Sequence, residues 1–320
     1  MLILGSGKLA VDVCRIMLSA RSWSTEVVGF VDDDPARCSE LLMNRRIIGG
    51  YERLFEIVET YEVQTIAVCM DDRRGVLPVQ TLLDFKAMGI DVVDGHALYE
   101  EGSGHLSIDL LRPSALIFST GFRQRRLTKV LKRLFDVVVS VCGLVILVPL
   151  FALIGIIIKL DSPGPVFYRQ MRVGLQGRPY MIWKFRSMSK DAEKNGPRWA
   201  EAKDPRVSRF GYWLRKLRID EVPQLINLVK GEMSLVGPRP ERPVFVQELR
   251  EHIPYYDLRH TVKPGITGWA QTRFRYGASA EDSHVKLQYD LFYVKNMSLL
   301  LDIRIVVETV RVVLLGEGAR

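Results

Sequence analysis

Cysteine is scarce in this sequence, with 4 residues in 320. The four are Cys14, Cys38, Cys69 and Cys142, and they stand too far apart for the short spacings with which thiolates bind metals. The pattern excludes a cysteine-based metal site. It predicts buried thiols in a protein of a reducing compartment.

Two kinds of sequence signal are also missing. No zinc-finger, RNA-binding or basic-zipper pattern accompanies the excess of 45 Lys+Arg over 37 Asp+Glu, so nucleic acid is excluded as a partner. For a net charge of +8, the remaining partners are an anionic membrane surface or phosphorylated substrates. No cleavable export signal is expected, because residues 1–4 run straight into a glycine turn as a first strand does.

Charge is absent between Val137 and Ile158, a run of 22 residues. As a helix, about 1.5 Å per residue gives roughly 33 Å, which is enough to cross the hydrocarbon core of a bilayer. Pro149 interrupts the run near its middle and predicts a break. Basic residues lie densely on both sides, at Arg123, Arg125, Arg126, Lys129, Lys132 and Arg133 before the run and at Lys159, Arg169, Arg172 and Arg178 after it. Because a spanning helix leaves one flank poor in positive charge, a re-entrant helix–break–helix is predicted over a spanning one.

The length of 320 residues predicts two domains. In the first, residues 1–122, strand patterns at 1–4, 27–34, 65–70 and 90–95 alternate with helical patterns, which indicates a doubly wound parallel sheet. Gly5-x-Gly7-x-x-Ala10, with an acid at Asp32 or Asp33, is typical of dinucleotide binding. A tight strand-to-helix turn in a sheet that binds no ligand explains the same residues, and we favour this interpretation because fold does not imply function.

Asp220 and Glu221 stand side by side before an apolar run that is periodic as a helix is. Asp is a favoured N-cap and Pro223 is tolerated in a first turn, so the pair is predicted at a helix N-terminus. Such an end attracts phosphate. There a carboxylate can act as a nucleophile on phosphorus, and its neighbour as a metal ligand or base. A capping residue followed by an acid that complements the helix dipole is the simpler alternative.

Residues 237–240, Gly-Pro-Arg-Pro, follow one short segment later. The two prolines restrict the backbone on both sides of Arg239 and display its guanidinium rigidly, which suits a phosphate. Arg215 and Arg218 flank the carboxylates on the other side. Together these residues describe a diphosphate site that contains a nucleophile.

Further candidates for contacts to substrate lie elsewhere in residues 163–320. Lys184 and Arg186 alternate with Phe185 on a predicted strand and could face one side. Arg206 lies in a turn before Phe210-Gly211, and Thr267 lies in a rigid loop, residues 263–269, that could hold a base or a sugar. Solvated surface or a packing turn is the plainer explanation of each one alone. Residues 297–315 have the period of an amphipathic helix, packed on a core or in the membrane interface.

The stretch LRKLRIDEVPQLINLVKGEMSLVGPRP, residues 214–240, resembles the bacterial sugar transferases, the monotopic polyprenyl-phosphate phosphoglycosyl transferases. Further similar segments are KFRSM, DPRVSRFG, KPGITGWAQ and YDLFYVKNMSLLLDI, spread over roughly the last two hundred residues. The whole chain resembles the exopolysaccharide-biosynthesis branch, in which a Rossmann-like domain precedes the catalytic one. Large members of that branch carry transmembrane helices before this domain, so the chain is expected to be naturally short or to lack its start.

The resemblance implies an α/β chain with a Rossmann-like accessory domain (1–122), a basic amphipathic helix and re-entrant membrane hairpin (123–162) and a small α+β catalytic domain (163–320). It implies transfer of a sugar-1-phosphate from a UDP-sugar to polyprenyl (undecaprenyl) phosphate through a covalent phosphosugar on Asp220. Mg²⁺ is the expected cofactor, with Glu221 and Asp220 as metal ligands. Arg239, Lys184, Arg186, Arg206, Arg215 and Thr267 are then the expected contacts to substrate or phosphate. The enzyme would lie at the inner membrane with its catalytic domain facing the cytoplasm, with homo-oligomerisation left open.

Two other functions remain open at this point. Residues 5–10 also suit a soluble NAD-dependent nucleotide-sugar dehydratase or epimerase, which leaves the 22-residue apolar run unexplained. The basic flanks also suit a non-catalytic membrane scaffold for polysaccharide assembly. The first predicts bound nicotinamide cofactor, and the second predicts that no UMP is released.

Overall fold

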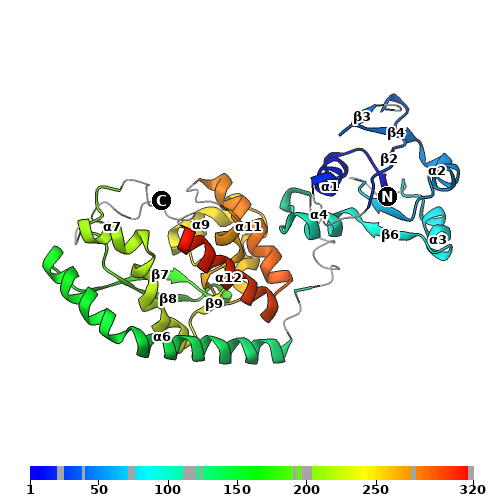
Figure 1. Ribbon diagram of the computed structural model, residues 1–320. Helices are drawn as coiled ribbons and strands as arrows, with labels where there is room; N and C mark the ends of the chain where they lie inside the picture. Colours follow the sequence, from blue (N-terminus) through cyan, green and yellow to red (C-terminus); the bar gives the residue numbers. More distant parts are fainter. Residues whose placement is uncertain are drawn as a thin grey trace. The chain divides into compact units, whose positions relative to one another are not determined.

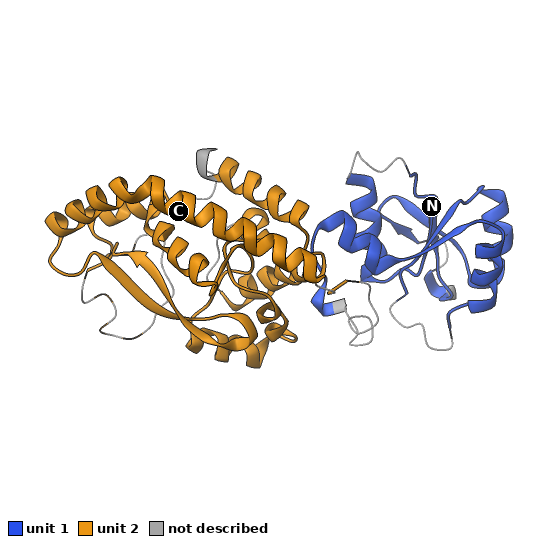
Figure 2. Cartoon of the chain, turned by 90° about the horizontal axis from the view of Figure 1, so that it is seen from below, with its two compact units in different colours: residues 1–118 blue, residues 119–320 orange. Residues whose placement is uncertain are grey.

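In the computed structural model the chain forms two compact units, residues 1–118 and 119–320 (Figure 2). The structure describes residues 1–19, 25–37, 40–70, 76–110, 121–122, 125–189, 192, 194, 196, 204–274 and 279–315. The apolar segment predicted as a region of its own, 123–162, falls within the second unit together with the predicted catalytic domain.

Unit 1 is built on a six-stranded sheet in the order β3-β4-β2-β1-β5-β6. The strands are β1 Leu2–Leu4, β2 Gly29–Val31, β3 Leu41–Leu42, β4 Arg45–Gly49, β5 Thr65–Val68 and β6 Asp91–Asp94. All neighbours run parallel except β3 and β4. The helices are α1 Lys8–Ser19, α2 Leu54–Thr60, α3 Val79–Ala87 and α4 Gly95–Ser103, with short 3-10 turns η1 Pro35–Arg37, η2 Tyr51–Arg53 and η3 Ile108–Leu110. The predicted alternation of parallel strands and helices is confirmed, whereas the β3-β4 hairpin was not predicted.

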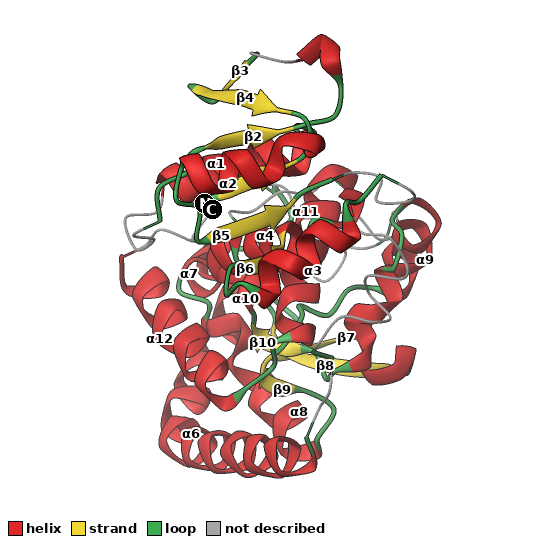
Figure 3. Ribbon diagram, turned by 90° about the vertical axis from the view of Figure 1, so that its right-hand side faces the viewer, coloured by secondary structure: helices red, strands yellow, loops and turns green. Residues whose placement is uncertain are grey.

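The side chains of β1 alternate between two hydrophobic cores, one on each face of the sheet. Ile3 packs with residues of α1 and α4, and Leu2 and Leu4 pack with residues of α2 and α3. Because successive strand residues point to opposite faces, this short apolar strand is buried on both sides. Figure 3 shows these helices against the strands of unit 1.

Unit 2 combines a long helix with small sheets and shorter helices (Figure 1). Its strands are β7 Phe167–Val173 and β8 Pro179–Phe185, which form an antiparallel hairpin, and β9 Ser234–Val236 and β10 Gly265–Thr267, which are parallel. Its helices are α6 Arg126–Asp161, α7 Arg209–Lys216, α8 Leu225–Lys230, α9 Pro243–His252, α10 Trp269–Arg273, α11 Ala280–Lys295 and α12 Leu299–Leu315. Shorter 3-10 segments are η4 Leu175–Gly177, η5 Ile219–Gln224 and η6 Tyr256–Thr261.

The break predicted at Pro149 is not present, because α6 runs as one helix of 36 residues through that proline. Leu144 and Leu147 pack on one hydrophobic core of unit 2, and Leu150 and Phe151 pack on another. A proline removes one backbone hydrogen bond, and packing on both sides of Pro149 holds the helical turns together. The helix is curved along its course (Figure 1).

Helix α6 is long and apolar enough to cross a membrane by length and composition, yet one of its faces contacts the rest of unit 2 at several points between Lys132 and Ile158. Near its start, Lys132 reaches Asp302 of α12. Near its end, Ile154 and Ile158 pack with Phe185 of β8. Both ends therefore lie against the same compact unit. The other face is exposed and apolar, at Val138, Val141, Val145, Ile146, Val148, Leu153, Ile156 and Leu160.

One smaller expectation, for the cysteines, needs correction, and one, for the last helix, is confirmed with an addition. Cys142 is exposed on α6, whereas Cys14 and Cys69 are buried as predicted and Cys38 lies outside the described residues. Helix α12 has the predicted amphipathic period, but it buries Ile305 against the core and exposes a second apolar stripe, at Leu300, Ile303, Val307 and Val310. The side chains of residues 313–315 lie outside the described part.

Candidate active site

Asp220 and Glu221 lie in η5, a 3-10 turn that leads directly into α8. Asp220 is therefore not the N-cap that its sequence context predicted. That position belongs to Arg218, which has a left-handed backbone with φ of 58°. The pair is buried in the first turn, at 8% and 7% exposure. A tight turn containing Pro223 sets the direction of both carboxylates.

Glu221 is paired with two cations from distant parts of unit 2. Its Oε1 atom lies 2.7 Å from Lys184 Nζ on β8 and 2.8 Å from Arg239 Nη2. Burial alone would raise the pKa of Glu221, but the charges of Arg239 and Lys184 hold it well below its ordinary value. Burial lowers the pKa of Lys184, an effect that Glu221 opposes. Arg239 and Lys184, which were predicted as contacts to substrate or phosphate, thus both lie beside the carboxylate pair.

Asp220 is the more basic of the two carboxylates. Burial raises its pKa to about 6, against the opposing charge of Lys184, and the charges of Arg215 and Arg239 oppose the shift more weakly. The ion pairs of Lys184 and Arg239 both go to Glu221. Two adjacent carboxyl groups are thereby given different proton affinities by their surroundings, an arrangement typical of catalytic sites.

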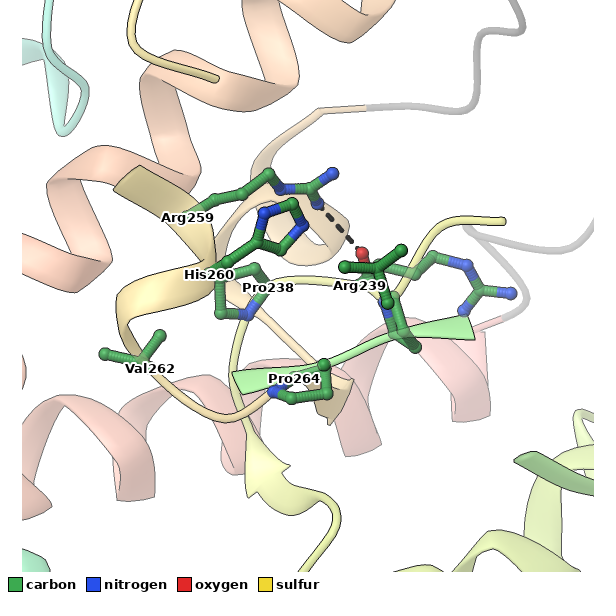
Figure 4. A pocket seen from close by; sticks show the side chains of 9 residues that line it. Pro238, Arg239, Arg259, His260, Val262 and Pro264 are labelled. Atoms are coloured by element: carbon green, nitrogen blue, oxygen red, sulfur yellow. Dashed lines mark hydrogen bonds between the residues drawn. The ribbon is translucent and has the colours of Figure 1, made fainter. Parts of the chain in front are cut away.

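Two further arginines donate hydrogen bonds to the backbone of the loop that carries Arg239. Arg259 Nη2 donates to the Arg239 carbonyl oxygen at 2.8 Å, which Figure 4 shows beside a small pocket lined by both residues. Arg172 Nη1 donates to the Pro240 carbonyl oxygen at 3.0 Å. These bonds hold the backbone, so the Arg239 side chain extends toward Glu221 from a rigid support.

Arg259 belongs to a buried cluster that sequence reasoning missed. It pairs with Asp290 of α11 at 2.8 Å and donates to the Tyr256 hydroxyl at 2.6 Å. Burial raises the pKa of Asp290 to about 6, although Arg259 opposes the shift. Asp290 lies in the segment YDLFYVKNMSLLLDI, which the sequence alone marked only by its similarity to the bacterial sugar transferases, with no role for Asp290. The available signal was an acid directly before the apolar run Leu291–Val294.

Three predicted substrate contacts have other partners in the structure. Arg186 lies past the end of β8 and donates to the carbonyl oxygens of Ile158, Ser162 and Pro163, at the end of α6. Arg206 pairs with Asp204 at 2.5 Å. The Thr267 hydroxyl is 2.6 Å from that of Thr309 on α12. Each contact is a structural use of the side chain, and Arg186 in particular satisfies carbonyl groups that a helix end leaves open.

The carboxylate pair fits a metal ion that is shared with substrate. The described residues contain no group of three or more His, Cys, Asp or Glu side chains that could hold a metal by themselves. Mg²⁺ is commonly bound by one or two carboxylates together with phosphate oxygens and water. Asp220 and Glu221 supply the carboxylates, and a diphosphate would have to supply further oxygens.

In unit 1, the side chain in the glycine turn is hydrogen-bonded to residues that follow β2. The Ser6 hydroxyl donates to Asp32 Oδ2 at 2.5 Å, and Arg37 Nη1 donates to Ser6 Oγ at 2.6 Å. In a dinucleotide site, an acid at this position binds the ribose hydroxyls. Here Asp32 is engaged by the turn itself, which supports the interpretation as a tight strand-to-helix turn.

Unit 2 thus combines an apolar surface helix with buried carboxylates and rigid cations, the features of a phosphate-handling site beside a membrane. The family model described as "Bacterial sugar transferase" matches residues 127–316. The chain therefore belongs to the bacterial sugar transferase family, as its motifs predicted.

Curated relatives agree with this assignment. An Aeromonas hydrophila UDP-N-acetylgalactosamine-undecaprenyl-phosphate N-acetylgalactosaminephosphotransferase is 47% identical over 59% of this chain and 45% of its own length. A Komagataeibacter xylinus undecaprenyl-phosphate glucose phosphotransferase is 34% identical over 97% of this chain and 58% of its own. A Rhizobium leguminosarum exopolysaccharide production protein is 39% identical over 57% of this chain and 94% of its own. The chain spans about half the length of the first two relatives.

Proposed function

We propose that this protein transfers a sugar-1-phosphate from a UDP-sugar to undecaprenyl phosphate and releases UMP, as the first step of exopolysaccharide or lipid-linked glycan synthesis. The observation that carries the proposal is the buried Asp220–Glu221 pair, with Arg239 and Lys184 on Glu221, in a unit that also contains an apolar surface helix. The names of the relatives give the substrate class, since two of them are undecaprenyl-phosphate sugar phosphotransferases.

The reaction proceeds by two displacements at phosphorus. An Asp220 carboxylate oxygen attacks the β-phosphorus of the UDP-sugar, the bond from that phosphorus to the bridging oxygen breaks, and UMP leaves with the electron pair. The phosphosugar is then an acyl phosphate on Asp220. A phosphate oxygen of undecaprenyl phosphate attacks the same phosphorus, the bond to Asp220 breaks, and the carboxylate is regenerated with undecaprenyl-diphosphate-sugar as product.

The different pKa values of the two carboxylates suit this two-step reaction. A pKa of about 6 leaves Asp220 ionised at neutral pH and more basic than an ordinary aspartate. Glu221 fixes Lys184 and Arg239 close to the nucleophile, where their charges can stabilise negative charge on phosphate oxygens. Mg²⁺, held by Asp220 and Glu221, would neutralise charge on the diphosphate when bound. Arg215, whose charge acts on Asp220, is a further phosphate contact in this proposal.

The proposed membrane arrangement follows from the packing of α6. A helix whose two ends contact one compact unit cannot have those ends on opposite sides of a bilayer. We infer that α6 lies in the inner membrane on its cytoplasmic side without crossing it, with its exposed apolar face in lipid. The active site then faces the cytoplasm, where UDP-sugars are found.

The test of the activity is UMP release by purified protein in nanodiscs over a panel of UDP-sugars with undecaprenyl phosphate. Wild-type protein given UDP-sugar without lipid acceptor should release one UMP per active site and carry the phosphosugar on a peptide that contains Asp220. A label on another residue would refute the covalent assignment. A complete absence of UMP release would favour the scaffold function instead.

The test of topology uses single cysteines at the two exposed ends of α6, Arg125→Cys and Asp161→Cys, in a background without the native cysteines. Both should be protected from a membrane-impermeant thiol reagent in intact cells and labelled after lysis. Labelling of one end from outside would mean that α6 spans the membrane.

A further inference from the structure

Helix α6 holds strand β9 through two side chains one helical turn apart. The Asp136 carboxylate accepts a hydrogen bond from the Leu235 backbone N–H at 2.9 Å. The Lys132 ammonium donates to the Val236 carbonyl oxygen at 3.0 Å. Residues four apart share one face of a helix, so both side chains reach the same strand. The helix that carries the apolar surface therefore also fixes two successive residues of β9.

The contact of Lys132 is part of a closed, buried network. Lys132 also pairs with Asp302 of α12 at 2.5 Å. The Tyr293 hydroxyl is 2.7 Å from Asp302 Oδ1 and 3.1 Å from the Val236 carbonyl oxygen. Asp136 and Asp302 are only 2% and 1% exposed. Buried polar groups of this kind are expensive to leave unpaired, so the network holds the Val236 carbonyl in one place.

Val236 directly precedes the loop that carries the cation of the site. Pro238 and Pro240 stand on either side of Arg239, and their fixed φ angles leave little freedom between the strand and the loop. At the far end of this short path, the Arg239 guanidinium lies 2.8 Å from Glu221. The placement of β9 therefore sets the placement of the guanidinium.

We propose that Lys132 and Asp136 are positioning residues for Arg239, so that the apolar helix is part of the scaffold of the active site. Neither side chain contacts reacting atoms, and both act through β9. The inference rests on the proposed function, because its main consequence is a loss of turnover. It also means that a movement of α6 away from β9 would move the Arg239 guanidinium away from the carboxylate pair.

A double-mutant cycle between Lys132→Met and Arg239→Ala tests this, with kcat/KM for UMP release as the measurement. Lys132→Met should lower kcat/KM by about 100-fold, the loss that a misplacement of about 1 Å can cause. The double variant should be no slower than Arg239→Ala alone, because a residue that acts through Arg239 then has nothing left to position. Losses that multiply in the double variant would overturn the proposal.

Conservative and matched variants separate positioning from general effects. Asp136→Asn keeps an oxygen that can accept the Leu235 bond and should retain most activity, whereas Asp136→Ala should lose it. Lys129→Met removes the same charge from an exposed position of α6 and should leave kcat/KM unchanged. If Lys132→Met does not fold, Asp136→Ala takes its place in the cycle. An equal loss in Lys129→Met would show a charge effect only and would overturn the proposal.

A binding measurement distinguishes failure of this inference from failure of the proposed function. UDP affinity, measured by calorimetry, should fall in Lys132→Met and stay unchanged in Lys129→Met. If wild-type protein releases no UMP, the proposed function fails. The comparison of UDP affinity between wild type and Lys132→Met then still tests the positioning role of Lys132. Equal UDP affinity in wild type and Lys132→Met would overturn the positioning role whatever the turnover.

Discussion

The two units of the chain place polar side chains in the interior in different ways. Within the described part of unit 1, Ser6 is the single buried polar or charged side chain, and its partners Asp32 and Arg37 lie in the segment that follows β2. Unit 2 buries charges, among them Asp220, Glu221 and Asp290. Because burying a charge is costly unless something compensates, buried charge is the stronger sign of a functional site.

The comparison also shows how a motif can have a purely structural cause. Gly5 has a φ of 98°, and a Cβ atom there would lie 3.0 Å from the Cys69 carbonyl oxygen. Any other residue would be strained, so the turn requires glycine whether or not a ligand binds. Asp220 has no such packing explanation, because an apolar residue would fill its place at lower cost.

The largest expected effect comes from Asp220→Asn, which keeps the shape of the nucleophile and removes its charge. UMP release should fall by roughly 10⁴-fold or more, as when a covalent nucleophile is lost. The melting temperature at pH 7 should not fall. A carboxyl whose folded pKa is raised to about 6 from 3.8 destabilises the folded state once it is ionised, and Asn removes that cost. Substantial activity in this variant would refute the assignment of Asp220 as the nucleophile.

Arg239→Lys should have the next largest effect. It keeps the charge but loses the planar group that reaches Glu221 from the rigid loop, so kcat/KM should fall by about 100-fold, the loss typical of one electrostatic donor. Arg250→Lys, in an exposed pair with Asp257, is the matched control and should change little. Similar losses of kcat/KM in both variants would show that the loss in Arg239→Lys does not depend on the position of Arg239 beside Glu221.

The pH dependence of the first half-reaction should expose the raised pKa of Asp220. Below about 6 the carboxyl binds a proton and is no longer a nucleophile, so the rate of the UMP burst should fall about tenfold per unit of pH. The burst without lipid acceptor is the measurement, because undecaprenyl phosphate itself titrates in this range. A rate that stays constant down to pH 5 would place the pKa near its ordinary value. Asp290→Asn should leave the position of the fall unchanged, which excludes the other carboxyl with a pKa of about 6.

The smallest effect on transfer is expected from Gly5→Ala in unit 1. The strained turn should cost about 1–3 kcal/mol of stability, measured as a lower unfolding transition. UMP release by the folded protein should stay close to wild type, and calorimetry should detect no stoichiometric NAD binding to either protein. Micromolar NAD binding that alters the transfer rate would make the turn of unit 1 a functional site.

The local patterns of the sequence predicted much of the fold. Alternation of apolar strands and helical segments predicted the parallel sheet of unit 1. The carboxylate pair and Arg239 were predicted as one site because they lie close in sequence. Lys184 was harder to place, since only the packing of β8 on η5 brings it to 2.7 Å from Glu221.

By itself the sequence determined the family, the apolar length of α6 and the acids of the site, because these depend on composition and local spacing. The tertiary structure decided which side chains lie beside the carboxylate pair and which contact other parts of the fold. Arg186 was assigned to the end of α6 and Thr267 to Thr309 by contacts between segments far apart in the chain. The same is true of Pro149, where α6 packs on both sides of the proline and stays continuous although the sequence predicted a break. At each of these positions, contacts with distant segments override the local preference of the sequence. The spacing of residues along the chain therefore does not predict these contacts.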